Sequence, residues 1–200
     1  MMYAAKRSRF IKKMKAKSLS PPSTYRHSSF VLRNYCDRES IMGRNLVGLG
    51  IDIHKLKRGR NLILGGVHIP FDLGLEGHSD ADILCHAIID AILGATNEGD
   101  IGVIYGIDRP EYKDADSLTL LQMVWKKLKK EYSIINIDSV IMAEKPKLTP
   151  FIHEMKYNIS KVLGIKIEQV SVKSTTAKGL GEIGRLKAMQ AQAIVSMTKK

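Results

Sequence analysis

Two short segments of the sequence bring together the residue types that bind divalent metal ions. Asp52 and His54 are separated by one residue, and His86 lies further along the chain. Residues i and i+2 of a β-strand point to the same face, so Asp52 and His54 can bind one cation together. A helix packed against that strand would add His86. One oxygen and two imidazole ligands with an open fourth position are typical of catalytic zinc or a similar divalent ion.

Each part of this pattern also has a purely structural interpretation. A strand Asp-x-His can be a surface ion pair, and a helical histidine that faces the core is often only hydrogen-bonded. The nearby Asp82 and Asp90 are better explained as capping and helix-packing residues than as ligands. The residues that surround this pattern in the sequence therefore decide between a metal site and a structural role.

Residues beside the metal pattern have the chemistry needed to hold phosphates and hydroxyls. His78 and Ser79 precede a predicted helix, and the N-terminus of a helix favours anions. Asp100 follows Gly99 in a predicted loop, where its carboxylate can accept hydrogen bonds from substrate hydroxyls. An ordinary turn aspartate fits that position as well.

Two later segments indicate a diphosphate and a nucleobase. Thr175 and Thr176 follow a predicted strand, and with Arg185 they resemble a diphosphate clamp. Threonines are common at strand ends, so this pattern is weak on its own. The loop 143–148 is fixed by Pro146, and its backbone can contact a nucleobase edge or serve as a plain connector.

The elements that must position these residues follow from hydrophobic periodicity and from turn residues. Strands are expected at 46–54, 61–69, 134–143, 170–174 and 186–197, a polar turn at 55–60, and helices from 79 or 80 to 94, from 116 or 117 to 131 and from 150 to 163. This order predicts an α+β fold with a small mixed sheet and helices packed on one face. The other face of the sheet then needs a partner, and oligomerisation would supply one.

The positive charge of the chain is concentrated at one end. The 200 residues carry a formal net charge of +12. Residues 1–45 hold eleven basic and two acidic residues, whereas residues 46–200 are nearly balanced. A basic, hydroxyl-rich segment is typical of an organelle transit peptide. Translation starting at Met42, which would make the earlier residues an artefact of the gene model, is a second interpretation.

These two interpretations place the protein differently. A real leader predicts the stroma of a plastid or apicoplast, and a start at Met42 predicts the cytoplasm. A basic arm that binds nucleic acid is a third interpretation, but no recognised nucleic-acid-binding motif accompanies it. All three leave residues 1–45 as an extension and residues 46–200 as one domain.

Composition excludes other classes of protein. No apolar run approaches the roughly 20 residues of a membrane-spanning helix. The cysteines Cys36 and Cys85 are too few for a disulfide-stapled scaffold. We therefore expect neither a membrane nor a nucleic acid as a partner, and Cys85 reads as a small core residue.

A series of motifs in order along the chain resembles the 2-C-methyl-D-erythritol 2,4-cyclodiphosphate synthase family. The matching segments are Asp52-x-His54, Gly65-Gly66-x-x-Ile69-Pro70, His78-Ser79-Asp80-x-Asp82-x-x-x-His86, Asp90-Ala91-x-Leu93-Gly94-Ala95, Gly99-Asp100-Ile101-Gly102, Pro146-Lys147 and Thr175-Thr176. The resemblance covers about residues 46–198.

The resemblance implies a homotrimer with an active site at each subunit interface. The substrate would be 4-diphosphocytidyl-2-C-methyl-D-erythritol 2-phosphate, which is cyclised with release of CMP, a step in the synthesis of isoprenoid (terpenoid) precursors. Asp52, His54 and His86 would hold one Zn²⁺ per subunit, and His78 and Thr176 would be catalytic. The residues implied in substrate binding are Ser79, Asp100, Ile101, Gly102, Ala143, Pro146, Lys147, Leu148, Thr149, Thr175, Lys178 and Arg185.

Two positions and one loop depart from the family's pattern. The loop is Tyr105-Gly106-Ile107-Asp108, where the family has Phe-Pro-Asp. Lys178 stands where the family usually has an acid that helps to hold Mg²⁺ or Mn²⁺, so binding of that second ion is expected to be weakened. Glu182 replaces a common aromatic residue before Arg185. The departures at Lys178 and Glu182 motivate an alternative, a catalytically weakened trimeric module that binds a cytidine nucleotide or an isoprenoid diphosphate.

Overall fold

The structure is a computed structural model that describes residues 45–105 and 116–200. The extension predicted at residues 1–45 lies outside the described residues, except for Asn45 at the start of the first strand. The transit peptide, the alternative start at Met42 and the compartment therefore stay predictions. Residues 106–108 of the loop that departs from the family's pattern also lie outside the described residues. No helix of the described segments is long and apolar enough to cross a membrane.

One mixed sheet of five strands organises the chain from Asn45 onward, in the order β4-β1-β7-β5-β6. Its strands are β1 (Asn45–Arg58), β4 (Leu73–Leu75), β5 (Tyr132–Met142), β6 (Val170–Thr175) and β7 (Ala188–Lys199). Strands β5 and β6 run parallel, and the other pairs are antiparallel. The predicted mixed sheet is confirmed.

A separate hairpin of β2 (Leu62–Leu64) and β3 (Val67–Ile69) lies before β4 in the chain. Its turn is Gly65-Gly66, whose φ angles are 57° and 69°. Two successive residues with positive φ are what a tight two-residue hairpin turn requires, and glycine adopts that conformation without a steric cost. The break predicted at these glycines is thus the hairpin turn itself.

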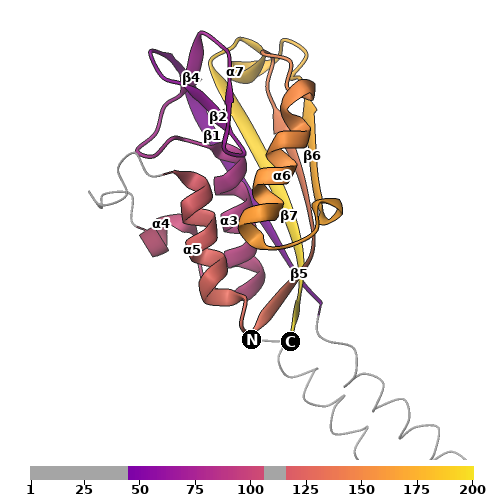
Figure 1. Cartoon of the computed structure of the whole chain (residues 1–200). Coiled ribbons are helices and arrows are strands. Elements are labelled where there is room, and N and C mark those ends of the chain that lie inside the picture. Colours follow the sequence, from indigo (N-terminus) through magenta and orange to yellow (C-terminus); the bar gives the residue numbers. More distant parts are fainter. Residues whose placement is uncertain (1–44, 106–115) are drawn as a thin grey trace, which may run out of the picture. The chain divides into compact units, whose positions relative to one another are not determined.

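The main helices pack against one face of the sheet (Figure 1). They are α3 (Ile83–Thr96), α5 (Ser117–Leu128) and α6 (Ile152–Leu163); the short elements are α4 (Ile101–Tyr105), α7 (Gly181–Gly184), η2 (Thr149–Phe151) and η3 (Ile167–Gln169). Helix α3 packs on β1 and β7, α6 packs on β6, and α5 lies against both helices. The opposite face of β1 exposes Val47, Leu49, Ile51 and Ile53.

Helix α3 approaches β1 very closely because two inward-facing residues of the strand are glycines. A Cβ atom at Gly48 would lie 1.8 Å from the Ala91 carbonyl oxygen, and one at Gly50 would lie 2.0 Å from that of Ala87. Any side chain there would push the helix away. Helix α3 is buried nearly all round, as expected of a central core helix.

The last strand shows how well period-two patterning predicts burial. The strand predicted at 186–197 is β7, and its alternating apolar residues are all buried: Met189, Ala191, Ala193, Val195 and Met197. Cys85 is also buried in the core, as predicted.

Several predicted boundaries are wrong. Residues 55–58 continue β1, because Lys55 pairs with β7 and residues 56–58 pair with β4, a strand that was not predicted. Helix α3 begins at Ile83, after its cap Asp82, and not at residue 79 or 80, and it runs past Gly94 to a left-handed cap at Asn97. Helix α5 ends at Leu128, three residues before the predicted end. The elements α4 and α7 were also missed.

Candidate functional site

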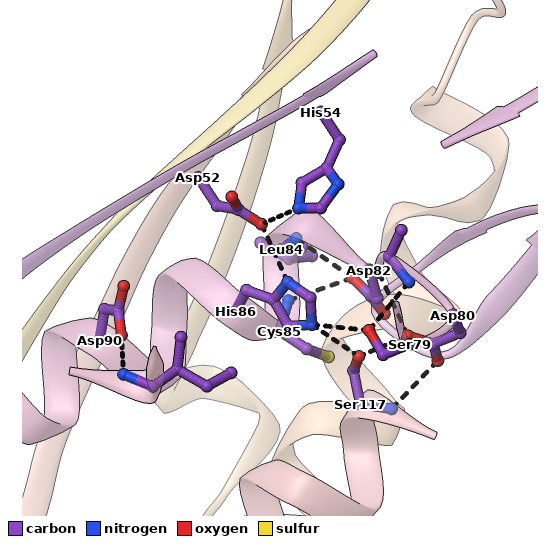
Figure 2. Close-up of polar contacts among 12 residues, drawn as sticks. Asp52, His54, Ser79, Asp80, Asp82, Leu84, Cys85, His86, Asp90 and Ser117 are labelled. Carbon is purple, nitrogen blue, oxygen red and sulfur yellow. Dashed lines mark hydrogen bonds and ion pairs between the residues drawn. The ribbon is translucent and has the colours of Figure 1, made fainter. Parts of the chain in front are cut away.

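The predicted metal ligands form one compact cluster on the inner face of β1. The Asp52 Oδ2 atom lies 3.1 Å from His54 Nε2 and 2.9 Å from His86 Nδ1 (Figure 2). One ligand atom from each residue lies within 4.8 Å of the others. The structure therefore brings together the three residues that the sequence pattern singled out.

Alternation in β1 and the first turn of α3 produce this geometry. Asp52 and His54 share the side of the strand that carries Gly48 and Gly50, so the close approach of α3 brings His86 against them. The three side chains are only partly exposed, at 21%, 21% and 12% for Asp52, His54 and His86. A cation bound there would be partly shielded from water.

The second nitrogen of each imidazole has a hydrogen-bond partner outside the cluster. His54 Nδ1 donates to the carbonyl oxygen of Glu76, which can only accept. His86 Nε2 lies 3.0 Å from Ser117 Oγ and 3.2 Å from Ser79 Oγ. These contacts leave His54 Nε2 and His86 Nδ1 facing the carboxylate. Such outer hydrogen bonds are the usual way of orienting metal-bound histidines, so the donor set fits a divalent ion.

The electrostatics of the cluster favour an ionised carboxylate. Burial alone would raise the pKa of Asp52, but hydrogen bonds with His54 and His86 outweigh it and hold this pKa well below its ordinary value. The pKa of His54 is raised, chiefly by its hydrogen bond with Asp52. The cluster thus places one anionic oxygen between two imidazoles, which suits a cation such as Zn²⁺.

The neighbouring aspartates hold the scaffold, as expected. Asp82 caps α3 through its Oδ1 atom, which accepts from the N–H groups of Leu84 and Cys85, each at 3.1 Å. Its Oδ2 atom accepts from Gly66 N–H at 2.8 Å, which ties the hairpin to the helix. Burial raises the pKa of Asp82. Asp90 accepts from Ile101 N–H at 2.8 Å.

The loop before α3 presents its two predicted phosphate contacts differently. His78 is exposed. Ser79 is buried, and its Oγ atom accepts from Ala81 N–H at 3.1 Å as well as contacting His86. Arg60 donates to the Ser79 carbonyl at 2.6 Å. Within one chain the Ser79 side chain therefore faces the metal cluster.

Three of the residues implied in substrate binding, Asp100, Ile101 and Gly102, lie at the start of α4. Asp100 is exposed, and its Oδ1 atom accepts from Val103 N–H at 2.8 Å. We had expected a loop here, but Ile101 and Gly102 begin a short helix because Asp90 and Asp100 accept from its first N–H groups. Ile101 and Gly102 are half-buried.

The residues predicted to bind the nucleotide and diphosphate lie where β5 and β6 end. Ala143 N–H donates to the Thr175 carbonyl at 2.9 Å, which fixes the loop 143–149 beside the end of β6. Ala143 and Leu148 are buried, and Pro146 is half-buried. The side chains left exposed in this region are Lys147, Thr149, Thr175, Thr176, Lys178 and Arg185.

A shallow hollow of about 540 Å³ lies among these ends, lined by Ile53, Met142, Thr176, Ala177, Lys178, Leu180, Gly181, Glu182 and Ile183. Ile53 is one of the residues on the bare face of β1. No hydrogen bond or ion pair between described residues joins the segment 175–185 to the metal cluster. Within the described part of the chain, Thr176 and Lys178 thus make no direct polar contact with Asp52.

Arg185 is held by an acid on its own segment. Its Nη1 atom lies 3.0 Å from Glu182 Oε1, and Lys187 Nζ lies 3.2 Å from Glu182 Oε2. Hydrogen bonds from Lys187 first, and from Arg185 next, lower the pKa of Glu182. Residue 182 thus neutralises two cations that a diphosphate could otherwise contact.

Sequence reasoning missed Ser117 and the role of Asp80. Ser117 is fully buried beside His86, although it lies far from that residue in the chain. Asp80 accepts from the Ser117 N–H at 3.0 Å and from its hydroxyl. The helix start at Asp116-Ser117 was predictable, but nothing in the local sequence connects it to the metal cluster.

Comparisons with known proteins agree with this geometry. The model of the YgbB family matches residues 46–198. The chain is 50% identical to the 2-C-methyl-D-erythritol 2,4-cyclodiphosphate synthase of Chlorobaculum tepidum over 149 residues, 74% of this chain and 95% of that protein. It is 50% identical to the synthase of the same name from Bacillus pumilus over 155 residues, 77% of this chain and 98% of that protein.

Solved structures are similar over the same region. The chain matches IspF of Plasmodium falciparum, in a CDP complex, with a TM-score of 0.69 and 36% identity over 79% of this chain and 98% of that one. It matches the bifunctional IspDF of Campylobacter jejuni with a TM-score of 0.76 and 38% identity, over 79% of this chain and 43% of that longer one. The similarity therefore spans the described domain.

Proposed function

Because the chain belongs to the YgbB family, we propose that it converts 4-diphosphocytidyl-2-C-methyl-D-erythritol 2-phosphate to 2-C-methyl-D-erythritol 2,4-cyclodiphosphate, with release of CMP, in isoprenoid precursor synthesis. The observation that carries the proposal is the convergence of Asp52, His54 and His86 on one point. The relatives named above are synthases, so a non-catalytic binding module is not favoured.

The reaction needs positioning and charge neutralisation more than a protein nucleophile. An oxygen of the 2-phosphate attacks the β-phosphorus of the same molecule, and a new P–O bond closes the ring. The bond between the β-phosphorus and the bridging oxygen breaks, and its electron pair leaves with CMP. Holding the two phosphates in line lowers the entropic part of the barrier, as in other phosphoryl transfers.

The metal cluster fits one Zn²⁺ ion, held by Asp52 Oδ2, His54 Nε2 and His86 Nδ1. A divalent ion there would polarise a phosphate oxygen and offset the charge that develops on it. The chain's own residues do the rest: the hydrogen bonds from His54 to Glu76 and from His86 to the two serines keep the rings aimed at the carboxylate.

Binding of a second ion, Mg²⁺ or Mn²⁺, is less well supported by the residues present. Lys178 contributes an ammonium group where such an ion would need an oxygen ligand. Its exposed side chain lines the hollow on the bare face of β1. We propose that this ammonium contacts a substrate phosphate directly and that binding of a second ion is weak.

The remaining site residues are proposed from the resemblance of their motifs to those of the family. His78 and Thr176 would contact the reacting phosphates, and Arg185 would contact the diphosphate. The cytidine would lie against the loop 143–149, which the end of β6 holds in place. Ser79, Asp100, Ile101, Gly102 and Thr175 complete the proposed substrate contacts.

A homotrimer would bring the two halves of the site together. Within one chain the metal cluster lies on the inner face of β1, whereas Ile53 and Thr176 line a hollow that includes the outer face. The outer face exposes four branched aliphatic side chains, which is unusual for a surface that meets only water. Association through this face would bury them and place the hollow at a subunit boundary.

The extension at residues 1–45 is proposed to be either a targeting leader or an artefact of the gene model, outside the catalytic domain of residues 46–200. The nearly balanced charge of the domain supports the division, since most of the net positive charge lies in the extension. A plastid or apicoplast stroma follows if the leader is present, and the cytoplasm follows if translation begins at Met42.

The proposal is tested with the purified full chain and the diphosphocytidyl substrate. CMP is measured by chromatography and the cyclic diphosphate by phosphorus NMR, with zinc and magnesium present. We expect both products from the wild type and neither from His86→Ala, whereas His68→Ala, which changes an exposed histidine on β3, should retain activity. A folded protein that binds zinc and releases no CMP would overturn the proposal.

A further inference from the structure

We propose that Asp80 and Ser117 are positioning residues that fix the tautomer of His86, so that its Nδ1 atom is the one presented to the metal. The inference rests on the metal centre of the proposed function. Asp80 and Ser117 are not among the proposed metal ligands or substrate contacts, and they act on the metal centre through His86. The side chains involved meet at the start of α5, beside the first turn of α3 (Figure 2).

The direction of the hydrogen bonds follows from Asp80. Its Oδ2 atom accepts from Ser117 N–H at 3.0 Å, and its Oδ1 atom accepts from the Ser117 hydroxyl in a very short contact. A carboxylate has no proton to donate, so the hydroxyl proton of Ser117 points to Asp80. The oxygen of Ser117 is left as an acceptor.

That oxygen lies 3.0 Å from His86 Nε2. Because the Ser117 hydroxyl has already donated its proton to Asp80, Nε2 must carry the hydrogen of this contact. A neutral imidazole has one N–H, so Nδ1 then bears the lone pair, and it lies 2.9 Å from Asp52 Oδ2. The serine and the carboxylate thus select the ring nitrogen that binds the cation.

Ser79 is compatible with either tautomer, because its hydroxyl can accept from Nε2–H or donate to Nε2, so Ser117 decides between them. Its Oγ atom lies 3.2 Å from His86 Nε2 and accepts from Ala81 N–H at 3.1 Å. If Nε2 instead carried a lone pair, that lone pair would face the lone pair of Ser117 in a fully buried position. Two acceptors that face each other repel, and the contact between Ser117 and His86 would be lost where water does not reach, so the Nε2–H tautomer is the stable one.

The same contacts couple α5 to the metal centre. Ser117 is the first residue of α5, and Asp80 also accepts from Asp82 N–H at 3.2 Å. One carboxylate therefore joins the loop before α3 to the start of α5. Displacing either segment would release His86 from its orientation.

The experiment measures zinc affinity of the full-length chain by competition with a chromogenic chelator. We expect Ser117→Ala to weaken zinc binding by about 10- to 100-fold, the usual effect of losing an outer hydrogen bond to a metal-bound histidine. Asp80→Asn should weaken it too, and Ser117→Thr should restore most of the affinity because it keeps the hydroxyl. The matched control is Ser139→Ala, which removes a buried hydroxyl that donates to Ser171 in the sheet.

A second measurement does not depend on zinc. Nitrogen NMR of the imidazoles in metal-free protein at alkaline pH should show His86 as the Nε2–H tautomer in the wild type and a mixture in Ser117→Ala. Zinc affinity within about twofold of wild type in folded Ser117→Ala, or an Nδ1–H tautomer in the wild type, would overturn the inference. If wild-type protein binds no zinc, the metal centre fails, and the NMR result alone decides the tautomer.

Discussion

The two faces of strand β1 differ in the residues that they carry and in what covers them. Its inner face carries Gly48, Gly50, Asp52 and His54, all turned toward α3. Its outer face carries branched aliphatic side chains with exposed fractions from 49% to 66%. The inner face is complete within one chain, since the polar groups around the cluster have partners there. The aliphatic side chains of the outer face stay largely exposed in the part of the chain that the structure describes.

The difference shows how a single strand can serve two purposes. On the inner side, glycines allow a helix to approach until its first turn delivers a metal ligand. On the outer side the strand carries large aliphatic side chains, which would be buried only if a second subunit packed against them. The metal cluster should therefore survive the loss of the outer partner, and the outer face should tolerate little that adds charge.

The largest expected effect comes from adding a side chain to a glycine on the inner face of β1. Gly50→Val would place a Cβ atom 2.0 Å from the Ala87 carbonyl oxygen. We expect a loss of more than about 4 kcal/mol in the free energy of unfolding, or no folded protein, because α3 must move. Urea unfolding and bound zinc are the measurements.

Gly94→Ala is the matched control for that substitution. Gly94 lies on α3, the helix that packs against Gly50. A Cβ atom at Gly94 would come no closer than 3.9 Å to the Leu49 carbonyl oxygen. It should stabilise the protein by about 0.5–1 kcal/mol through helix propensity. Equal destabilisation by both changes would show that close packing of α3 on β1 does not control the fold.

The next effect tests the outer face. Ile51→Lys should prevent association through the bare sheet face, since a charge would have to be buried there. We expect a monomer by light scattering, a loss of CMP release of roughly a hundredfold from the incomplete site, and unchanged zinc content.

Met123→Lys is the comparison for this charge. Met123 is 38% exposed on α5, so the new lysine stays in water there. This variant should behave like the wild type in both mass and activity. A fully active Ile51→Lys monomer would mean that the site is complete within one chain.

A smaller effect concerns the cap that holds α3 in place. Asp82→Ala removes the acceptor for Leu84 and Cys85 N–H and leaves Gly66 N–H without its partner. The lost cap and the unsatisfied group together predict a loss of about 2–4 kcal/mol in the free energy of unfolding. Asp82→Asn keeps one acceptor oxygen and should lose less; a larger loss than in Asp82→Ala would contradict this account. Urea unfolding decides between them.

The sequence predicts the inner cluster because its determinants are local. Spacing i and i+2 puts Asp52 and His54 on one face, and helical periodicity turns His86 to the core. The alternation in β7 identifies a strand in the same way. The shared face of Asp52 and His54 needs no knowledge of distant contacts, whereas the contact with His86 also requires that α3 packs on β1.

Other features depend on pairs that are distant in sequence. Residues 55–58 look like a polar turn, and they are strand because Lys55 pairs with β7 and residues 56–58 pair with β4. Ser79, Asp80 and Asp82 are all suitable caps, and the tertiary contact with Gly66 is made by Asp82. Ser117 reaches His86 through packing of α5, which no local pattern encodes.

The smallest expected effect is at the hollow beside the outer face. Glu182 pairs with Arg185 and Lys187, and all three side chains are exposed. Glu182→Gln removes the competing carboxylate, so both cations become available to the substrate diphosphate and KM should fall. Exposed ion pairs are weak, so the change should stay within about fivefold, with kcat nearly constant. Steady-state kinetics against Glu168→Gln, which changes an exposed acid in η3, provides the comparison. A rise in KM would contradict this account. It would show that Glu182 assists substrate binding, for example by holding Arg185 and Lys187 in place.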